Sequence, residues 1–121
     1  MLIADDHPVF RRGLKEVVEE SGQFRVIAEV GDGHEALREI RAQDPDAVVL
    51  DISMPELNGI DASRIIRRDF PSVHIIILSM HADRRFVDEL FGLGVSGYLL
   101  KDSAFEELAE AIRSVQRGEC Y

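Results

Sequence analysis

The strongest constraint on the fold is a pair of short apolar runs in which hydrophobic residues do not alternate with polar ones. The runs occupy residues 47–50 and 75–78, and they end in Asp51 and Ser79. Successive side chains of a strand point to opposite faces of its sheet, so an uninterrupted apolar run fits a strand covered on both faces. Such strands belong to parallel sheets with helices on either side. The chain is therefore predicted to be an α/β protein.

The rest of the chain repeats a unit of one strand and one helix. Strands are predicted at residues 1–4, 24–30, 47–51, 75–79 and 97–100, and helices at about residues 8–20, 34–43, 60–69, 87–93 and 104–117. Apolar residues recur at helical spacing in the first helix, at Val9, Leu14, Val17 and Val18. Because strand-helix-strand units wind with one hand, the pattern predicts a doubly wound, five-stranded parallel sheet with five helices, in a single domain of residues 1–121.

The charge and cysteine content limit the classes of partner and compartment. The chain carries a formal net charge of −9. A protein of this sign repels DNA and anionic lipid, so its partners are expected to be proteins or cations. Cys120 is the only cysteine, which rules out an intramolecular disulfide and suits a reducing cytoplasm. No apolar run approaches the length that crosses a bilayer, so we expect a cytoplasmic protein without a membrane segment.

Polar residues end or directly follow four of the five predicted strands. They are Asp5, Asp6, Asp51, Ser79 and Lys101. All strands of a parallel sheet run the same way, so these residues converge on the carboxyl edge, where doubly wound folds bind their ligands. The sequence therefore predicts a single site built from three acids, a hydroxyl and an ammonium group.

Three carboxylates at one edge need a positive partner. Two unit charges about 5 Å apart repel by roughly 3 kcal/mol at an effective dielectric constant near 20. A divalent cation removes this repulsion, and oxygen ligands suit Mg²⁺ better than Zn²⁺. A carboxylate beside Mg²⁺ and a lysine can attack a phosphoryl group, because both cations neutralise the transferring oxygens. The pattern predicts a phosphorylation switch in which Asp51 is the acceptor and the Ser79 hydroxyl can donate to the attached phosphoryl group.

The same residues carry a resemblance to a known family. The motifs are Asp5-Asp6, Asp51 followed by Met54-Pro55 and Asn58-Gly59, then Ser79, and the run from Gly97 to Lys101. In this order and spacing, the chain resembles the receiver domain of bacterial response regulators over essentially its whole length. The resemblance implies the flavodoxin-like, CheY-like fold with strand order 2-1-3-4-5.

Two segments point to a subfamily. Residues 4–8 and 98–103 are similar to regulators of the NarL/FixJ type, whose receivers precede a LuxR-type helix-turn-helix. The resemblance implies a transcription regulator whose C-terminal DNA-binding output domain is absent from this chain. Contact with DNA would then belong to the absent domain. A stand-alone receiver that acts through protein contacts only is the alternative.

The resemblance also implies roles for individual residues. Asp51 would accept the phosphoryl group from a sensor histidine kinase or from a small donor such as acetyl phosphate. Mg²⁺ would be held by Asp6, Asp51 and the backbone carbonyl of Ser53, with Asp5 acting mostly through water. Lys101 would pair with the phosphoryl oxygens.

Two further residues are implied in the switch. Ser79 would move toward the phosphoryl group, and Tyr98 would turn inward into the vacated space. This change would reshape the surface of the fourth helix, the fifth strand and the fifth helix, and it would allow a homodimer to form on phosphorylation. Such a domain is a signalling module rather than an enzyme, although it assists its own phosphotransfer and dephosphorylation.

Other functions fit these residues less well. A phosphatase of the haloacid-dehalogenase class needs a second acid two residues after its nucleophile, where Ser53 stands. A nucleotide- or flavin-binding domain needs a glycine-rich loop after the first strand, where Asp5 and Asp6 would repel phosphate. None of the histidines, which are His7, His34, His74 and His81, has the paired spacing of a zinc site.

Overall fold

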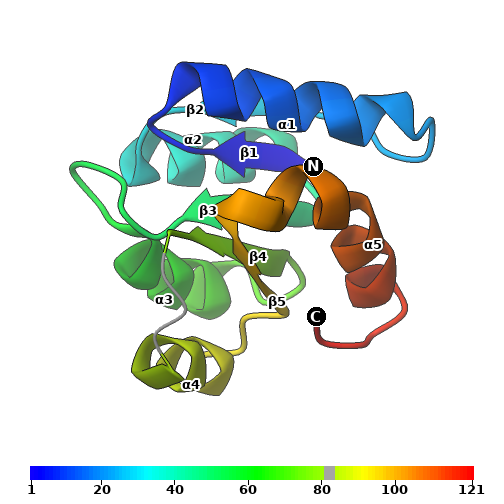
Figure 1. Cartoon of the computed structure of the whole chain (residues 1–121). Coiled ribbons are helices and arrows are strands. Elements are labelled where there is room, and N and C mark those ends of the chain that lie inside the picture. Colours follow the sequence, from blue (N-terminus) through cyan, green and yellow to red (C-terminus); the bar gives the residue numbers. More distant parts are fainter. Residues whose placement is uncertain (81–83) are drawn as a thin grey trace.

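One parallel sheet of five strands forms the centre of the molecule (Figure 1). The computed structural model describes residues 1–80 and 84–121. The strands are β1 (Leu2–Ala4), β2 (Ala28–Val30), β3 (Ala47–Asp51), β4 (His74–Ser79) and β5 (Gly97–Leu100). They pair in the order β2-β1-β3-β4-β5, and every pairing is parallel. The predicted doubly wound fold and its strand order are confirmed.

Helices cover both faces of the sheet (Figure 1). One face packs against α1 (Pro8–Glu20) and α5 (Ala104–Gln116), and the other against α2 (Gly33–Gln43), α3 (Gly59–Asp69) and α4 (Arg84–Gly92). These are the five helices that the sequence predicted. A short 3₁₀ helix, η1 (Lys101–Ser103), connects β5 to α5 and was not predicted.

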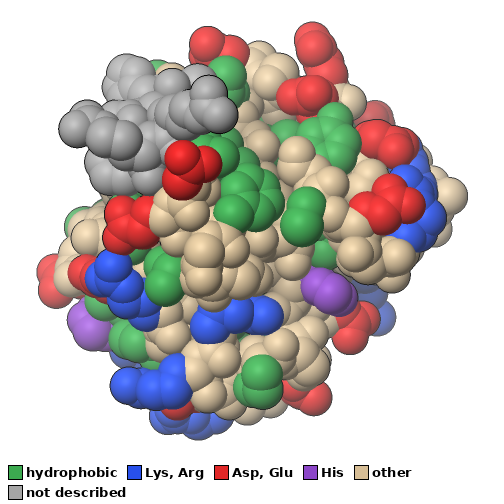
Figure 2. All heavy atoms as spheres, turned by 90° about the horizontal axis from the view of Figure 1, so that it is seen from below, with side chains coloured by type: hydrophobic (Ala, Val, Ile, Leu, Met, Phe, Trp, Pro, Cys, Tyr) green, Lys and Arg blue, Asp and Glu red, His purple; other side chains and the backbone are tan. Residues whose placement is uncertain are grey.

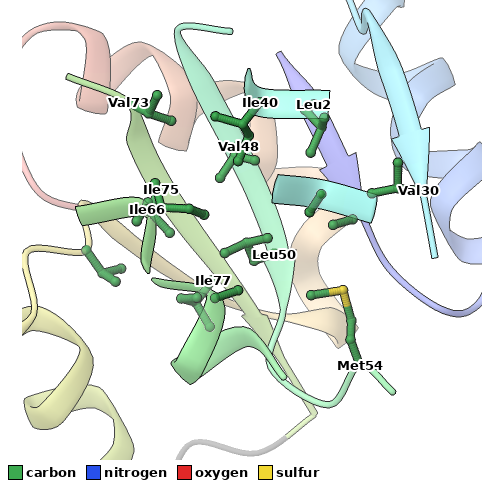
Figure 3. Close-up of a cluster of buried hydrophobic side chains, with 14 of the residues drawn as sticks. Leu2, Val30, Ile40, Val48, Leu50, Met54, Ile66, Val73, Ile75 and Ile77 are labelled. Atoms are coloured by element: carbon green, nitrogen blue, oxygen red, sulfur yellow. The ribbon is translucent and has the colours of Figure 1, made fainter. Parts of the chain in front are cut away.

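The two faces of the sheet carry separate hydrophobic cores. In β3, Val48 and Leu50 point into the core under α2, α3 and α4, whereas Val49 points into the core under α1 and α5. Figure 3 shows the first of these cores, where Ile40 of α2 and Ile66 of α3 lie over the strands. All these side chains are buried. Burial on both faces explains why the central strands are continuously apolar.

The second strand is shorter than predicted. We expected residues 24–30, whereas β2 covers only Ala28–Val30. The first residue of β1, Leu2, pairs with Ala28. Residues before Ala28 extend past the end of this ladder, although the Ile27 N–H still donates to the Met1 carbonyl at 2.9 Å. The length of this edge strand is set by its single neighbour.

One position of the apolar pattern in α1 was misread. Leu14 and Val18 are buried as expected, but Val9 is 89% exposed. At 3.6 residues per turn, Val9 and Val18 lie about 180° apart around the helix. Val9 therefore belongs to the outer surface of α1.

The loop after β3 returns tightly to the sheet. A Cβ atom at Gly59 would lie 2.6 Å from the Asp51 carbonyl oxygen and 2.8 Å from Ile52 Cα, so only glycine allows this approach. Asn58 caps α3, because its Oδ1 accepts a hydrogen bond from the Asp61 N–H at 2.9 Å. The start of α3 is thereby held against the end of β3.

The surface carries charges of both signs. Figure 2 shows acidic and basic side chains interspersed on the face seen from below. On α3, Arg64 lies 3.1 Å from Asp61 and 2.8 Å from Glu89 of α4, so it joins the two helices. Cys120 is exposed. Within the described ranges, no helix has the length and apolar character needed to cross a membrane.

Candidate functional site

Asp51 lies at the floor of a polar cluster at the carboxyl edge of the sheet. It is the last residue of β3 and is only 1% exposed. Its Oδ1 accepts a hydrogen bond from the Ser53 N–H at 3.1 Å, and its Oδ2 accepts one from the Lys101 ammonium at 3.0 Å. One donor on each oxygen therefore fixes the orientation of this carboxylate.

Lys101 follows β5 directly and lies between two carboxylates. Its Nζ is 3.0 Å from Asp51 Oδ2 and 3.0 Å from Asp5 Oδ2, the second contact being an ion pair without hydrogen-bond geometry. Burial by itself lowers the pKa of Lys101, but the two carboxylates outweigh burial and raise the pKa above its ordinary value. The ring centroid of Phe10 lies 5.1 Å from the ammonium, within reach of a cation–π interaction. Lys101 is thus a charged group held inside the cluster.

The acidic pair after β1 is held in place by an arginine. Asp5 is fully buried, whereas Asp6 is exposed. Nη1 of Arg11, from α1, donates to the carbonyl of Asp5 at 2.7 Å and to the carbonyl of Val30 at 3.1 Å. One guanidinium therefore ties the ends of β1 and β2 together beside the pair. The sequence prediction missed Arg11, because nothing in the local pattern shows where a side chain of α1 reaches.

His7 is the second residue of the site that the sequence prediction missed. Its Nδ1 lies 3.1 Å from Asp5 Oδ1, 3.1 Å from Asp6 Oδ1 and 3.9 Å from Asp51 Oδ2. The same nitrogen is 3.1 Å from Lys101 Nζ. The histidines were considered only as a set with zinc spacing. The adjacency of His7 to two acids after a strand is the signal that would have found it.

The cluster fits a metal ion. One ligand atom from each of Asp5, Asp6, His7 and Asp51 lies within 4.8 Å of the others. The Lys101 ammonium lies 3.0 Å from both Asp5 and Asp51, so one positive charge serves three carboxylates and negative charge is in excess. Three carboxylates, of which Asp6 is exposed to solvent, are suitable ligands for a hard divalent cation. His81 lies outside the described residues.

The other predicted residues lie around this cluster. Ser79 is the last residue of β4 and is buried. Ser53 lies exposed in the loop after β3, with its N–H bonded to Asp51. Tyr98 of β5 is partly buried against the core on the α2, α3 and α4 side. The structure thus brings Asp5, Asp51 and Lys101 into contact, while the roles assigned to these residues remain predictions.

An apolar hollow opens beside the cluster. It has a volume of about 520 Å³ and is lined by His7, Val9, Phe10, Met80, Lys101, Asp102 and Phe105. Three of the lining side chains are large, apolar and exposed: Val9 (89%), Met80 (59%) and Phe105 (44%). Phe105 is supported by Phe10, with ring centroids 5.1 Å apart. An apolar surface therefore borders the polar cluster.

The fold and this acid-lysine cluster are those of a signalling receiver, and comparison with protein families agrees. A model of the response regulator receiver domain matches residues 1–113. The chain belongs to this family.

Curated relatives and solved structures are similar over nearly the whole chain. The transcriptional regulatory protein DegU of Brevibacillus brevis is 36% identical over 121 residues, covering 100% of this chain and 51% of that protein. The nitrate/nitrite response regulator protein NarP of Escherichia coli (strain K12) is 40% identical over 118 residues, covering 98% of this chain and 55% of that protein. A crystal structure of a LuxR-family two-component response regulator from Aurantimonas sp. SI85-9A1 superposes with a TM-score of 0.93 at 37% identity, covering 98% of this chain and 85% of that one.

These relatives also support the subfamily. They confirm the resemblance to regulators of the NarL and LuxR type. The chain spans about half the length of the curated relatives it matches. The chain is therefore a receiver domain of the two-component response regulator class.

Proposed function

We propose that this chain is a phosphorylation-controlled switch in which Asp51 accepts the phosphoryl group. The observation that carries the proposal is the contact between Asp51 and Lys101 within a group of three carboxylates. A carboxylate between an ammonium and a divalent cation suits phosphoryl transfer, because charge on the transferring group is neutralised from two sides.

In the proposed reaction, a carboxylate oxygen of Asp51 attacks the phosphorus of a phosphohistidine on a sensor histidine kinase. The P–O bond forms as the P–N bond breaks, and the departing imidazole takes a proton from water. Lys101 pairs with a phosphoryl oxygen, which its position 3.0 Å from Asp51 Oδ2 allows. Acetyl phosphate would serve as a small donor, and attack of water on the phosphoaspartate would return the domain to its starting state. The domain thus assists its own phosphotransfer and dephosphorylation.

Mg²⁺ is the proposed cofactor. Asp6, Asp51 and the backbone carbonyl of Ser53 would hold the ion, and Asp5 would act through water. The excess of three carboxylates over one ammonium supports a cation at this position. When bound, the ion supplies positive charge for the phosphoryl oxygens.

We propose that Ser79 and Tyr98 transmit the change. Asp51 and Ser79 end two paired strands, which supports a Ser79 hydroxyl that donates to a phosphoryl group on Asp51. Tyr98 pairs with Ile77 on the neighbouring strand and is only partly buried, so packing does not enclose its ring on every side. The similar receiver of RcsB from Salmonella enterica serovar Typhimurium was solved with the phosphomimetic BeF₃⁻. The same mimic should shift the amide signals of Tyr98 and α4 in this chain.

The apolar surface formed by Val9, Met80 and Phe105 is the proposed contact for the kinase. It borders the hollow beside Lys101, so a partner that brings a phosphohistidine to Asp51 must cover it. Val9→Glu should slow phosphorylation by the kinase and leave phosphorylation by acetyl phosphate unchanged. Equal effects on the two donors would contradict this contact.

We propose that the chain acts within a transcription regulator. The similar proteins are named as transcriptional or response regulators and are about twice as long as this chain. A further, DNA-binding domain would make the DNA contact that a net charge of −9 disfavours in this one. Phosphorylation would promote a homodimer that places two such domains on DNA, in the cytoplasm. The alternative, a receiver that acts through protein contacts alone, has no comparable support.

Mass spectrometry of the intact chain tests the acceptor. With acetyl phosphate and Mg²⁺, the wild type should gain the mass of one phosphoryl group and Asp51→Asn should gain none. Asp46→Asn is a matched control, because Asp46 is exposed just before the start of the same strand. Labelling of Asp51→Asn at the wild-type level would refute the assignment.

A further inference from the structure

We propose that His7 binds the divalent cation of this site directly through Nδ1, and that this nitrogen gives the site a preference for first-row transition metal ions over Mg²⁺. The inference deepens the proposed function, because it concerns the cation of the same acidic cluster. It changes the expected ligand set from oxygen alone to three carboxylates and one imidazole.

The first argument is the spacing of the candidate ligand atoms. Nδ1 of His7 is 3.1 Å from Asp5 Oδ1, 3.1 Å from Asp6 Oδ1 and 3.9 Å from Asp51 Oδ2. Ligand atoms that share an octahedral ion at about 2.1 Å are about 3 Å apart when adjacent and about 4.2 Å apart when opposite. The three separations from Nδ1 fall in this range, and all four ligand atoms lie within 4.8 Å of one another. A slight closing of the cluster would therefore let one ion contact His7 and the carboxylates together.

The second argument is a conflict around the imidazole nitrogen. Nδ1 lies 3.1 Å from two carboxylate oxygens, which only accept hydrogen bonds, and 3.1 Å from the Lys101 ammonium, which only donates. A protonated Nδ1 cannot accept from the lysine, and an unprotonated Nδ1 cannot donate to the acids. A cation among these atoms removes the conflict, because the nitrogen lone pair and the carboxylates can all bind it.

The third argument is the excess of negative charge in the cluster. Asp5, Asp6 and Asp51 bring three carboxylates together, and one ammonium, Lys101, lies 3.0 Å from both Asp5 Oδ2 and Asp51 Oδ2. Asp5 Oδ1 also accepts the His7 N–H at 2.7 Å. This backbone bond fixes His7 relative to Asp5, and Pro8 begins α1 immediately afterwards. These contacts hold the backbone of His7 beside the cluster that its Nδ1 enters.

An imidazole ligand changes metal preference. Carboxylate, carbonyl and water ligands suit Mg²⁺, Ca²⁺ and Mn²⁺, whereas imidazole suits later first-row transition ions such as Ni²⁺. Mg²⁺ gains little from a nitrogen ligand. The wild-type site should therefore bind Co²⁺ and Ni²⁺ more tightly than Mg²⁺, and the advantage should depend on His7.

Pulsed electron paramagnetic resonance with Mn²⁺ tests the bond itself. The wild-type chain should show nitrogen modulation from a directly bound imidazole, and His7→Gln and His7→Ala should abolish it. The ring is 62% exposed, so neither substitution leaves a buried cavity. His34→Gln is the matched control, because His34 is exposed on α2 outside the cluster.

Affinity titrations supply the second readout. His7→Gln should weaken Ni²⁺ binding by about tenfold and change Mg²⁺ binding by less than about threefold, since Ni²⁺ gains from the nitrogen ligand and Mg²⁺ does not. Mn²⁺ bound in an Asp51-dependent way without nitrogen modulation would overturn the role of His7 and leave the proposed function intact. Nitrogen modulation that persists in His7→Gln would overturn it as well. Mn²⁺ and Mg²⁺ binding unaffected by Asp51→Asn and Asp6→Asn would overturn both this inference and the proposed magnesium site.

Discussion

Lys101 Nζ lies 3.0 Å from Asp51 Oδ2, although the two residues are 50 positions apart in the chain. Both residues are almost entirely buried, at 7% and 1% exposure. The same ammonium is 3.0 Å from Asp5. A single cation therefore joins the carboxyl ends of β1, β3 and β5, and it contributes to folding as well as to the proposed chemistry.

Removal of the Lys101 charge should destabilise the fold. In Lys101→Met, the buried carboxylates of Asp5 and Asp51 lose their cation, and breaking a buried ion pair in this way costs about 3 kcal/mol or more. Urea unfolding in the presence of a chelator measures the loss. Lys15→Met is the matched control, because Lys15 pairs with Glu29 at 3.8 Å outside the cluster and should change stability by less than about 1 kcal/mol. Equal effects of the two substitutions would show that the buried pair contributes nothing.

The contribution of Lys101 should disappear in alkali. Its pKa is raised in the folded protein, chiefly because the Asp5 and Asp51 carboxylates outweigh the opposing effect of burial. A raised folded pKa gives stability that is complete below the unfolded pKa and is lost as the pH rises through the folded pKa. The stability difference between wild type and Lys101→Met should be constant from pH 7 to about 9 and should narrow above about pH 10.5. Urea unfolding midpoints of the two proteins across this pH range give the measurement. A stability difference between wild type and Lys101→Met that widens in alkali would contradict the prediction.

A methyl group at Gly59 should push α3 away from the site. Its Cβ would lie 2.6 Å from the carbonyl oxygen of Asp51, so the backbone must shift. Gly59→Ala should cost about 2 kcal/mol or more, as other overpacking substitutions do. Gly92→Ala, at the end of α4 with nothing within 4 Å of the new atom, should be neutral or stabilising by up to about 1 kcal/mol. Thermal unfolding of the two variants gives the comparison.

Arg11 should stabilise the corner that carries the acidic pair. Its Nη1 donates to the carbonyls of Asp5 and Val30. Arg11→Met should cost about 2 kcal/mol, because two carbonyls at the ends of strands lose a charged donor. Arg12→Met should have almost no effect, since Arg12 is 65% exposed and lies 3.8 Å from its nearest acid. If Arg11→Met also weakens Mg²⁺ binding while Arg12→Met does not, the arginine positions the metal ligands in addition to stabilising the sheet.

Much of the site was predictable because strand ends are local features of the sequence. Asp51 and Ser79 were found from the apolar runs that precede them, and Lys101 from its place after the last strand. The edge on which they meet follows from the common direction of parallel strands. These arguments need no knowledge of how side chains pack.

The errors arose where an interaction depends on another segment. The second strand is short because β1 begins at Leu2, which pairs with Ala28, and therefore has no partner for the residues before Ala28. Val9 is exposed because it lies on the side of α1 opposite to the buried Val18. His7 was considered only as one of four histidines without zinc spacing, and Arg11 was not considered. Both act only after α1 has packed over the ends of β1 and β2.

The sequence alone determined the order of strands and helices, the burial of the central strands and the identity of the polar residues at the sheet edge. Those properties follow from chain-local patterns of apolar and polar side chains. Only the tertiary structure decided which polar atoms share a few ångströms: the ammonium of Lys101 between two acids, the ring of His7 among the carboxylates, and the guanidinium of Arg11 across two strands. Distances between residues far apart in the chain are set by how α1 packs on the sheet and how β5 pairs within it, and no local sequence pattern predicts these contacts.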